Sequence, residues 1–298
     1  MEKQLPWLGT PAGTIEILQK YGFHFQKRYG QNFLIDPHVL EKIIRIADIG
    51  EDDCVLEIGP GIGTLTQYLA YAAKKVCAVE IDAMLIPILE ETLRGWDNVS
   101  VIHADILQTD IEHIAQIYNE GRPVKIVANL PYYITTPILM RLLETRVPVS
   151  SITVMVQKEV AERMQAVPGG KEYGALSLAV RYYTEPHMEA LVPPNCFIPR
   201  PGVGSAVIRL DIRPDTSHRV KDEKLLFTLI RAAFGQRRKT LLNSLRNGLP
   251  QAGITLAKED LLDAVRLLGL PESVRGEALS LEEFIRLSDL LTEKGAAG

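Results

Sequence analysis

Residues 55–64 read Val-Leu-Glu-Ile-Gly-Pro-Gly-Ile-Gly-Thr, a buried-strand pattern followed at once by a glycine-rich turn. Glycine lacks a Cβ, so the turn can bend sharply and let a ligand approach the backbone, and the helix expected at 64–73 offers free N–H groups at its start. The stretch predicts a small-ligand site after the first core strand. Dinucleotide binding would need the motif Gly-x-Gly-x-x-Gly. If the motif starts at Gly59 its sixth position is Thr64, and if it starts at Gly61 its sixth position is Thr66, so neither start fits. The sequence therefore disfavours nicotinamide and flavin cofactors.

Short apolar runs rich in β-branched residues lie around this loop and alternate with helical patterns. The expected strands are 54–58, 76–79, 99–102, 124–128 and 152–156, and the expected helices are 37–48, 64–73, 82–94, 110–119, 136–145 and 157–166. Two later alternating runs, 188–192 and 205–210, are expected to close the sheet. Strands that alternate with helices at this spacing indicate right-handed βαβ units. We therefore expect an α/β fold with a doubly wound sheet.

Helical patterns dominate from residue 218 onward, and Ser280 with Glu283 forms a capping box for the last helix. A length of 298 residues predicts roughly two domains. We expect an N-terminal extension over 1–36, an α/β domain over 37–213 and a smaller all-α domain over 218–298.

The charge distribution is uneven. The chain has a net charge of −4, yet residues 221–246 contain seven basic and two acidic side chains, a local charge of +5. This cluster is either a solvated helix face or a surface that contacts nucleic acid. The remaining composition predicts a cytoplasmic protein: no apolar stretch could span a membrane, no secretion signal is apparent, and three distant cysteines fit reduced thiols without a metal site. No long heptad or large apolar repeat is present, so we expect a monomer.

Acidic residues follow two further strands. Glu80 lies 17 residues past Gly63, where a carboxylate can accept both hydroxyls of a ribose. Asp105 follows the next strand, where its carboxylate and the backbone of Ile106 suit the exocyclic amine of adenine. Asp105 equally suits a turn or a helix cap. Because these strand ends meet at one edge of a parallel sheet, they predict a nucleoside site.

The fourth strand ends in Asn129-Leu130-Pro131-Tyr132-Tyr133-Ile134. The exocyclic amine of adenine is a poor nucleophile because its lone pair is delocalised, so acceptors that hold its N–H bonds assist attack. Asn129 Oδ1 and the carbonyl of Leu130 or Pro131 can supply them, while an aromatic ring covers the base. The alternative is a purely structural role, with Asn129 as a turn residue and Tyr132 as a core-packing residue.

Six motifs, taken in order, resemble the ribosomal RNA adenine N6,N6-dimethyltransferase family, and within it the bacterial small-subunit branch. They are Lys27–Leu34, Glu57–Gly63, Val79–Asp82, Asp105–Ile106, Asn129–Ile134 and Phe197–Pro201. The likeness covers nearly the whole chain. It implies an enzyme with a Rossmann-like methyltransferase sheet over 37–213 and a smaller C-terminal all-α, RNA-binding domain over 218–298.

The resemblance also implies S-adenosylmethionine as cofactor and assigns roles to individual residues. The implied cofactor contacts are Asn32, Leu34, Gly59, Gly61, Glu80, Ile81, Asp105, Ile106 and Asn129. The implied catalytic residues are Asn129, which touches cofactor and target amine, and Tyr132 and Phe197, which stack on the two faces of a flipped adenine. The implied RNA contacts are Lys27, Arg28, Arg200, Arg237, Arg238 and Lys239.

The function implied by the resemblance is dimethylation of two adjacent adenosines near the 3′ end of 16S rRNA, with a role in biogenesis of the small ribosomal subunit. Three alternatives remain. A 23S rRNA methyltransferase of the macrolide-resistance type shares the site, although Leu130 and the acidic chain favour the small-subunit branch. A ribosome-assembly factor would bind without needing catalysis. A DNA adenine methyltransferase usually has Asp at the position of Asn129.

Overall fold

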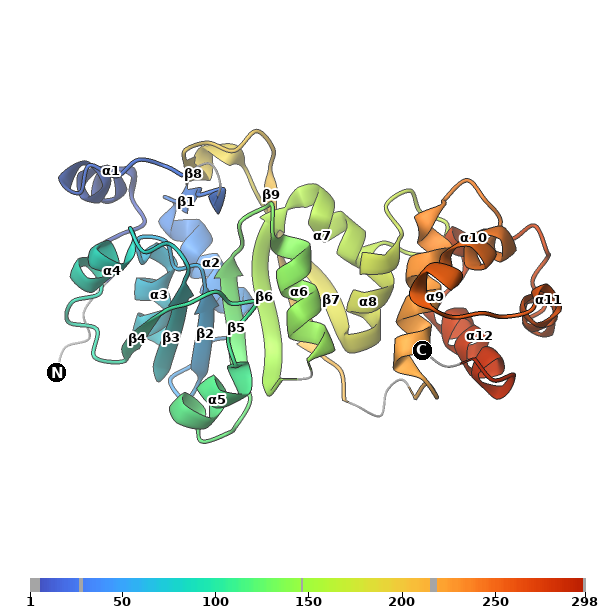
Figure 1. Cartoon of the computed structure of the whole chain (residues 1–298). Helices are drawn as coiled ribbons and strands as arrows, with labels where there is room; N and C mark the ends of the chain where they lie inside the picture. The colour runs from blue at the N-terminus through green and yellow to red at the C-terminus, as the bar shows by residue number, and fades with distance from the viewer. Residues whose placement is uncertain (1–5, 27–28, 146, 215–218, 297–298) are drawn as a thin grey trace. The chain divides into compact units, whose positions relative to one another are not determined.

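The computed structural model describes residues 6–26, 29–145, 147–214 and 219–296. Its contacts divide the chain into two compact units. An α/β unit comprises the described parts of Met1–Ala161 and Pro186–Ile212, and a helical unit comprises those of Glu162–Glu185 and Arg213–Gly298 (Figure 1).

The described part of the chain forms a seven-stranded sheet in the order β4-β3-β2-β5-β6-β9-β7 (Figure 1). The strands are β2 (Cys54–Ile58), β3 (Lys75–Glu80), β4 (Val99–His103), β5 (Val124–Asn129), β6 (Val149–Gln157), β7 (Thr184–Val192) and β9 (Ser205–Ile212). Strands β2 to β6 pair in parallel, whereas β9 pairs antiparallel with β6. The predicted doubly wound sheet is confirmed, and the two late runs close it as expected.

Helices cover this sheet. They are α2 (Pro37–Ile46), α3 (Thr64–Ala72), α4 (Ile86–Thr92), α5 (Ile111–Asn119) and α6 (Thr135–Glu144). Apolar side chains of α2 and α3 pack in one core with Val55, Val76 and Val127, and α6 lies in front of the sheet in Figure 1. Helix α4 is shorter than the expected 82–94, because the Asp82 carboxylate accepts the Met84 N–H at 3.1 Å and forms a turn before the helix.

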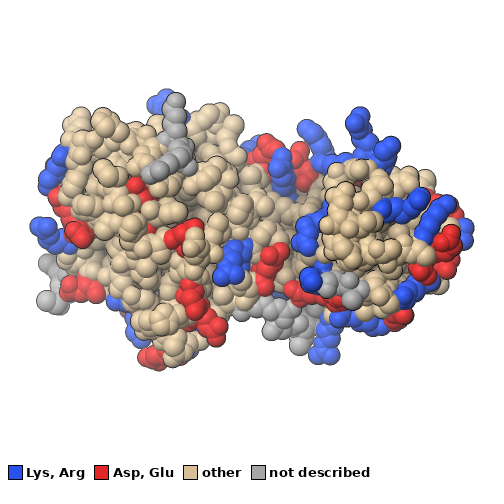
Figure 2. Space-filling view, viewed as in Figure 1, with Lys and Arg blue, Asp and Glu red and all other residues tan. Residues whose placement is uncertain are grey.

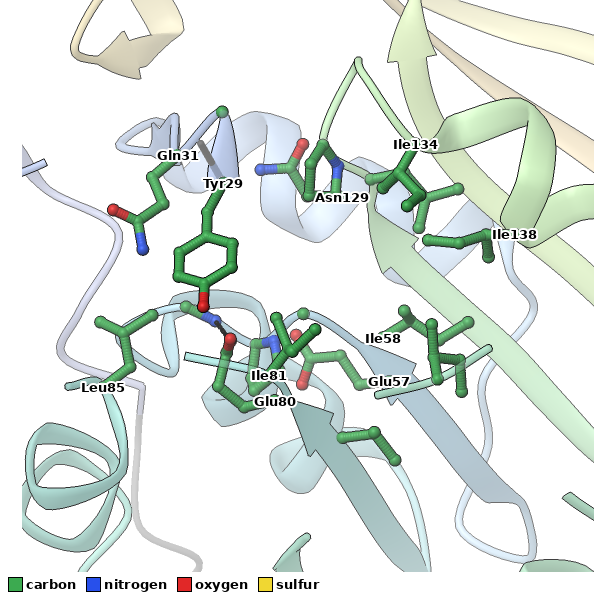
Figure 3. A pocket seen from close by; sticks show the side chains of 18 of the residues that line it. Tyr29, Gln31, Glu57, Ile58, Glu80, Ile81, Leu85, Asn129, Ile134 and Ile138 are labelled. Atoms are coloured by element: carbon green, nitrogen blue, oxygen red, sulfur yellow. Dashed lines mark hydrogen bonds between the residues drawn. The ribbon is translucent and has the colours of Figure 1, made fainter. Parts of the chain in front are cut away.

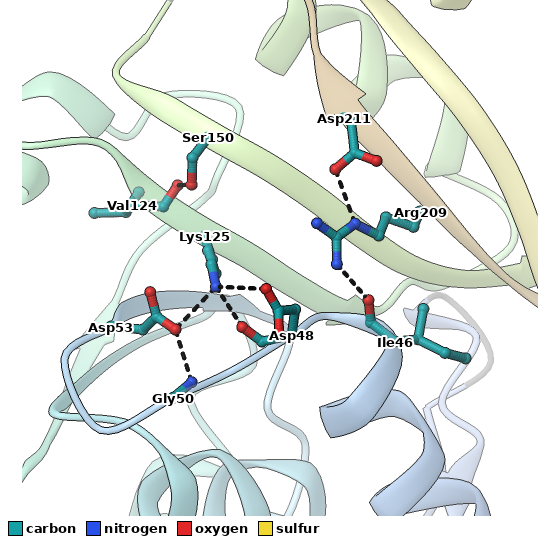
Figure 4. Close-up of polar contacts among 9 residues, drawn as sticks. All are labelled: Ile46, Asp48, Gly50, Asp53, Val124, Lys125, Ser150, Arg209 and Asp211. Atoms are coloured by element: carbon teal, nitrogen blue, oxygen red, sulfur yellow. Dashed lines mark hydrogen bonds and ion pairs between the residues drawn. The ribbon is translucent and has the colours of Figure 1, made fainter.

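Polar contacts at the amino ends of the strands hold the connections there (Figure 4). Lys125 Nζ lies 2.9 Å from Asp53 Oδ2 and also donates to the Asp48 carbonyl. Arg209 donates to the carbonyl of Ile46 at 2.7 Å, at the end of α2. These contacts fix one edge of the sheet, opposite to the edge at which strands β2, β3 and β5 present their carboxyl ends.

Besides the single-turn 3-10 helix Pro194–Cys196, one α-helix and two strands of the described α/β unit lie outside the expected set. Helix α1 (Pro11–Lys20) begins after Thr10, whose hydroxyl accepts the Gly13 N–H at 3.2 Å. Strands β1 (Phe33–Leu34) and β8 (Phe197–Ile198) pair antiparallel. Two-residue strands leave no periodic signal in a sequence, so only the folded chain shows that Leu34 and Phe197 are neighbours.

The helical unit contains the C-terminal helices, as expected. Its helices are α8 (Ala175–Tyr183), α9 (Glu223–Gly235), α10 (Leu241–Gly248), α11 (Lys258–Leu267) and α12 (Leu281–Glu293), and α7 (Lys158–Gln165) enters it. The unit also takes in Glu162–Glu185, which the sequence analysis placed in the α/β domain. The physical reason is packing: the Tyr173 hydroxyl donates to the Leu279 carbonyl at 2.8 Å, and the ring of Tyr182 meets that of Phe227 at 5.2 Å.

None of the described helices combines the length and apolar character needed to cross a membrane. Within the same residues, no three His, Cys, Asp or Glu side chains gather in a way that could hold a metal ion. Cys54, Cys77 and Cys196 are buried and carry free thiols.

Candidate active site

A cavity lies at the carboxyl ends of β2, β3 and β5, where open α/β sheets bind their ligands (Figure 3). All nine residues that the sequence assigned to the cofactor line it, and Tyr132 lines it as well. The cavity wall also includes Tyr29, Gln31, Glu57 and Tyr133, which the sequence analysis did not single out. The structure thus brings together motifs that are spread over a hundred residues of the chain.

The glycine turn after β2 shapes one wall of the cavity. Gly59, Gly61 and Gly63 have φ angles of 69°, 63° and 89°, values that residues with a Cβ rarely adopt. A Cβ on Gly61 would lie 2.9 Å from the ring of Phe33, whereas a Cβ on Gly59 would meet no atom within 4 Å. Gly59 therefore leaves open space at the backbone, which a ligand can occupy.

Glu80, at the end of β3, presents a buried carboxylate that the glycine turn holds in place. Its Oε2 accepts the Gly61 N–H at 3.2 Å, and its Oε1 accepts the Asp82 N–H at 2.8 Å. Burial raises the pKa of Glu80, and these backbone donors oppose the shift. A carboxylate has about four acceptor positions, so Glu80 retains lone pairs for a diol such as that of ribose.

Asp105, after β4, combines a turn role with a place in the cavity wall. Its Oδ1 accepts the Leu107 N–H at 2.9 Å, and its Oδ2 accepts from Gln108 Nε2 at 3.2 Å. Asp105 and Ile106 both line the cavity. The turn role considered from the sequence is therefore observed, while contact with a base stays a prediction.

Asn129 ends β5, and its amide is oriented by a distant part of the chain. Asn129 Nδ2 donates to the backbone carbonyl of Asn32 at 3.0 Å. A carbonyl only accepts hydrogen bonds, so this contact fixes which way the amide faces and leaves Oδ1 to act as an acceptor.

The backbone carbonyls of Leu130 and Pro131, next to Asn129, differ in whether they are free to accept a hydrogen bond from a ligand. The Pro131 carbonyl accepts the Ile134 N–H at 3.2 Å and the Thr135 hydroxyl at 3.1 Å, at the start of α6. Of the two carbonyls that the sequence offered, Pro131 is thus occupied. This favours the Leu130 carbonyl as the second acceptor beside Asn129.

Two tyrosines follow. The Tyr132 hydroxyl shares a hydrogen bond of 2.6 Å with the Ser205 hydroxyl, which anchors the half-buried ring, and burial raises the pKa of Tyr132. Tyr133 also lines the cavity but is 55% exposed. A fixed aromatic ring beside an oriented amide suits recognition of a planar base.

The structure does not bring Phe197 to the cavity. This side chain is 1% exposed and belongs to the hydrophobic core that also contains Leu34 and Cys196. The reason lies in the pairing of β1 with β8, which sets Phe197 opposite Leu34 and directs packing inward.

A short N-terminal segment, residues 29–34, forms part of the cavity wall, and we call it the strap. Buried Asp82 holds it: Asp82 Oδ2 accepts from Gln31 Nε2 at 2.7 Å and from Gln26 Nε2 at 3.2 Å. Gln31 Oε1 in turn accepts the Gln26 N–H at 3.0 Å. The strap carries the Asn32 carbonyl that orients Asn129, so Asp82 supports the site without lining it.

The helical unit carries three of the predicted RNA contacts, and Lys and Arg side chains gather on it in Figure 2. Arg237 is engaged within the unit: its Nη2 donates to the Lys171 carbonyl at 2.9 Å and lies 3.3 Å from Glu277. Arg238 and Lys239 follow and are exposed. The latter two side chains therefore offer accessible positive charge.

The other predicted RNA contacts belong to the N-terminal extension and the α/β unit. Arg200 follows β8 and is exposed. Lys27 and Arg28 lie outside the residues that the structure describes.

Fold and cavity together define a methyltransferase of the Rossmann-like class. The structure is similar to the crystal structure of a dimethyladenosine transferase from Plasmodium falciparum, with a TM-score of 0.74 and 28% identity over 89% of this chain and 98% of that one. It is also similar to the crystal structure of the 23S rRNA methyltransferase ErmE, with a TM-score of 0.64 and 26% identity over 87% of this chain and 99% of that one.

Sequence comparisons identify the family within this class. The model of the ribosomal RNA adenine dimethylase family matches residues 22–283. A protein of Lachnoclostridium phytofermentans named ribosomal RNA small subunit methyltransferase A is 61% identical over 291 residues, 97% of this chain and 99% of that protein. A protein of the same name from Bacillus pumilus is 50% identical over 285 residues, which are 95% of this chain and 97% of that protein. The chain belongs to the ribosomal RNA adenine dimethylase family and is an rRNA adenine methyltransferase.

The methyl donor of this family is S-adenosylmethionine, and the cavity fits it. Gly59 leaves room for close approach, and Glu80 can accept ribose hydroxyls. Three carboxyl groups, those of Glu57, Glu80 and Asp105, line the cavity, and no Lys, Arg or His is found among its described lining residues. This charge pattern suits a ligand with a net positive charge.

Proposed function

We propose that this enzyme dimethylates N6 of two adjacent adenosines near the 3′ end of 16S rRNA and thereby contributes to biogenesis of the small ribosomal subunit. Identity of 61% to a protein named ribosomal RNA small subunit methyltransferase A, over nearly the whole chain, supports the choice of subunit. The observation that carries the choice of atom is the Asn129 amide, which is oriented as an acceptor beside Tyr132.

The chemistry follows from these groups. Adenine N6 is a weak nucleophile, and Asn129 Oδ1 and the Leu130 carbonyl accept its N–H bonds and draw the nitrogen toward tetrahedral geometry. Tyr132 stacks on the base and holds its plane. S-adenosylmethionine, when bound, supplies an electrophilic methyl group on a sulfonium that leaves as a neutral thioether. The aminium can lose its proton to water, so positioning supplies most of the acceleration, for which about 7–11 kcal/mol is available in principle.

Each proposed cofactor contact is assigned to one part of S-adenosylmethionine. Asn32 and Leu34 of the strap are placed at the methionine end, Gly59 and Gly61 at the turn, and Glu80 at the ribose. Ile81, Asp105 and Ile106 are placed at the adenine. Support comes from their common place in one cavity wall.

Base stacking is assigned here to Tyr132. Alanine substitutions of aromatic residues that stack on bases cost roughly 1–3 kcal/mol per base, which helps to offset the unstacking of a flipped adenine. Phe197 was predicted to cover the second face. Since its ring is in the core beside Leu34, that role requires the core to open locally; without such opening, Phe197 supports the strap.

The proposed partner is the small ribosomal subunit or its precursor. Arg238 and Lys239 in the helical unit and Arg200 in the α/β unit are exposed cations suited to phosphates. Arg237, Lys27 and Arg28 complete the proposed set. We further propose that the enzyme acts in the cytoplasm and that it is a monomer. Sedimentation of the purified protein tests the oligomeric state directly.

The test of the proposed function is transfer of labelled methyl groups from S-adenosylmethionine to unmethylated small subunits, followed by nuclease digestion and nucleoside mass spectrometry. We expect N6,N6-dimethyladenosine in the fragment from the 3′ end of 16S rRNA. Labelling of large-subunit RNA instead would assign the enzyme to the 23S type represented by ErmE. Binding to either subunit without transfer would favour an assembly factor.

A further inference from the structure

The buried carboxyl group of Glu57 is not used by the function described above. Glu57 lies in β2, two residues before Gly59, and is 1% exposed. It nevertheless forms part of the cavity wall, and Figure 3 shows its carboxyl group on the same side of the cavity as that of Glu80. Within the described residues, its Oε2 has no hydrogen-bond partner. A buried polar atom without a partner is costly, so its retention beside a cavity points to a ligand.

Among the residues that the structure describes, the surroundings of Glu57 offer no compensating positive charge. Its register neighbours are Ala78 in β3 and Val127 in β5, both apolar. From α3, Thr66 faces it with a hydroxyl that also lacks a well-aligned partner. The charged group of the described part of the chain that acts on it is Glu80, which is acidic as well. The ionised form of Glu57 therefore has little support in the free protein.

The pKa of Glu57 reflects this setting. Burial is the main cause that raises the pKa of Glu57 to about 8; the Thr66 hydroxyl opposes this shift, and the nearby charge of Glu80 adds to it. A group with a pKa near 8 is mostly protonated at pH 7. A cation placed beside Glu57 would stabilise the carboxylate and lower that pKa again.

We propose that Glu57 receives a cationic group of the methyl donor and gives up one proton to solvent when the donor binds. The inference rests on the proposed function only in taking S-adenosylmethionine as the donor. The step balances simply: a neutral carboxyl group and a cation become a carboxylate–cation pair, and one proton enters the solvent. No bond of the donor changes. The donor has two candidate cations, its sulfonium and its ammonium, and the experiment separates them.

The experiment is calorimetric titration of the full-length enzyme with S-adenosylmethionine at pH 7 in two buffers of different ionisation enthalpy, which counts released protons. We expect about 0.9 proton per bound donor, the fraction of a group of pKa near 8 that is protonated at pH 7. Glu57→Gln keeps the size of the side chain and removes the ionisable group, so its release should fall to nearly zero. Glu80→Gln is the matched control: it should bind more weakly and still release most of the proton, because burial, and not the charge of Glu80, is the main cause of the raised pKa of Glu57.

A second measurement on the unaltered enzyme covers the case in which Glu57→Gln does not fold. Between pH 6.0 and 7.5 the donor's ammonium stays largely protonated, and no histidine is found among the described lining residues. The Kd for S-adenosylmethionine should fall roughly 20-fold over this range, as the ionised fraction of Glu57 grows. A flat Kd would overturn the proposal.

The remaining outcomes are separable. S-adenosylhomocysteine retains the ammonium and lacks the sulfonium, so proton release with both ligands assigns the ammonium, and release with S-adenosylmethionine alone assigns the sulfonium. Donor binding without proton release, or equal release by Glu57→Gln, overturns the role of Glu57 and leaves the proposed function intact. Absence of donor binding would instead count against the proposed function.

Discussion

At the scale of single residues, the site depends on how a side chain is turned as much as on which side chain it is. An amide can present either its oxygen or its nitrogen to a ligand. In Asn129 the choice is made by the Asn32 carbonyl, which takes the Nδ2 hydrogen at 3.0 Å. The oxygen is thereby left for an amine that needs an acceptor.

Replacing Asn129 with Ala removes this acceptor. We expect kcat for methyl transfer to fall by about 100-fold or more, the effect of deleting one preorganised hydrogen-bonding group at a reacting centre. RNA affinity should be unchanged, because the proposed phosphate contacts lie elsewhere. Labelled-methyl transfer and filter binding measure the two quantities. Asn129→Asp is the control for orientation: it keeps an acceptor but cannot donate to Asn32. Full activity of Asn129→Ala would show that the assigned role is wrong.

Glu80→Ala tests the ribose contact. Hydrogen bonds to a charged group contribute about 1.5–3 kcal/mol, so the Kd for S-adenosylmethionine should rise about 10- to 100-fold. Affinity for small-subunit RNA should not change. Calorimetry of both ligands is the measurement, and an unaltered cofactor Kd would exclude Glu80 as the ribose acceptor.

Residue types and spacing located some of these groups in advance. Gly59 was predictable because a turn after a core strand needs positive φ, and Glu80 because it ends the next strand. The buried position of Phe197 was not predictable, since it depends on pairing with Leu34, 163 residues away. The missing partner of Glu57 is likewise a property of the folded interior, although its place just before the glycine turn was a usable signal.

At the scale of elements, the strap couples the N-terminal segment to the sheet. Asp82 accepts hydrogen bonds from Gln31 and Gln26, and the strap carries the carbonyl that orients Asn129. The side chain of Asp82 is therefore a positioning group that acts through residues 29–34.

Asp82→Ala should loosen the strap. We expect the Kd for S-adenosylmethionine to rise about tenfold, a loss of roughly 1.4 kcal/mol, and the amides of residues 29–34 to exchange hydrogen faster. Asp110→Ala is a matched control, because Asp110 caps α5 through the His113 N–H at 3.0 Å and its loss costs stability without touching the strap. Equal exchange rates at 29–34 in both variants would contradict the role of Asp82.

Helices α9 and α10 approach each other closely at a glycine. A Cβ on Gly248 would lie 2.7 Å from the Cβ of Ala232, whereas a Cβ on Gly235 would meet nothing within 4 Å. Gly248→Ala should therefore lower the free energy of unfolding by about 1–3 kcal/mol. Gly235→Ala, the control, should leave it unchanged or raise it by about 0.4–1 kcal/mol. Urea unfolding decides, and equal stability of the two variants would refute the packing account.

Element boundaries were predictable where hydrophobic periodicity is clear. The strand expected at 54–58 is observed as Cys54–Ile58, and the helix expected at 110–119 as Ile111–Asn119. Helix α8 was not expected; its buried residues include the consecutive run 177–180, which departs from the spacing of a helix with one buried face. Packing of Tyr182 against Phe227 then joins this segment to the C-terminal helices, a long-range contact that no local pattern reports.

At the scale of the whole molecule, acidic and basic side chains are concentrated in different parts of the chain. The net charge is −4, while residues 221–246 carry +5 within the helical unit. The cofactor cavity has acidic lining groups, and the helical unit has exposed Arg238 and Lys239. A cationic cofactor and a polyanionic substrate can thus be attracted by different parts of an acidic protein.

The salt dependence of RNA binding tests the basic half of this division. The double variant Arg238→Ala, Lys239→Ala should reduce the slope of log Kd against log salt concentration by about 1–2. RNA binding releases about 0.7–0.9 counterions for each phosphate contact, so each lost contact lowers the slope by that amount. Adding Arg237→Ala should change the slope less and lower Tm, since Arg237 is already engaged with Lys171 and Glu277. Arg266→Ala in α11 is the control, because Arg266 pairs with Glu272 at 2.8 Å. An unchanged slope in the double variant would leave the cluster as a solvated helix face, and would move RNA recognition to the cations of the α/β unit.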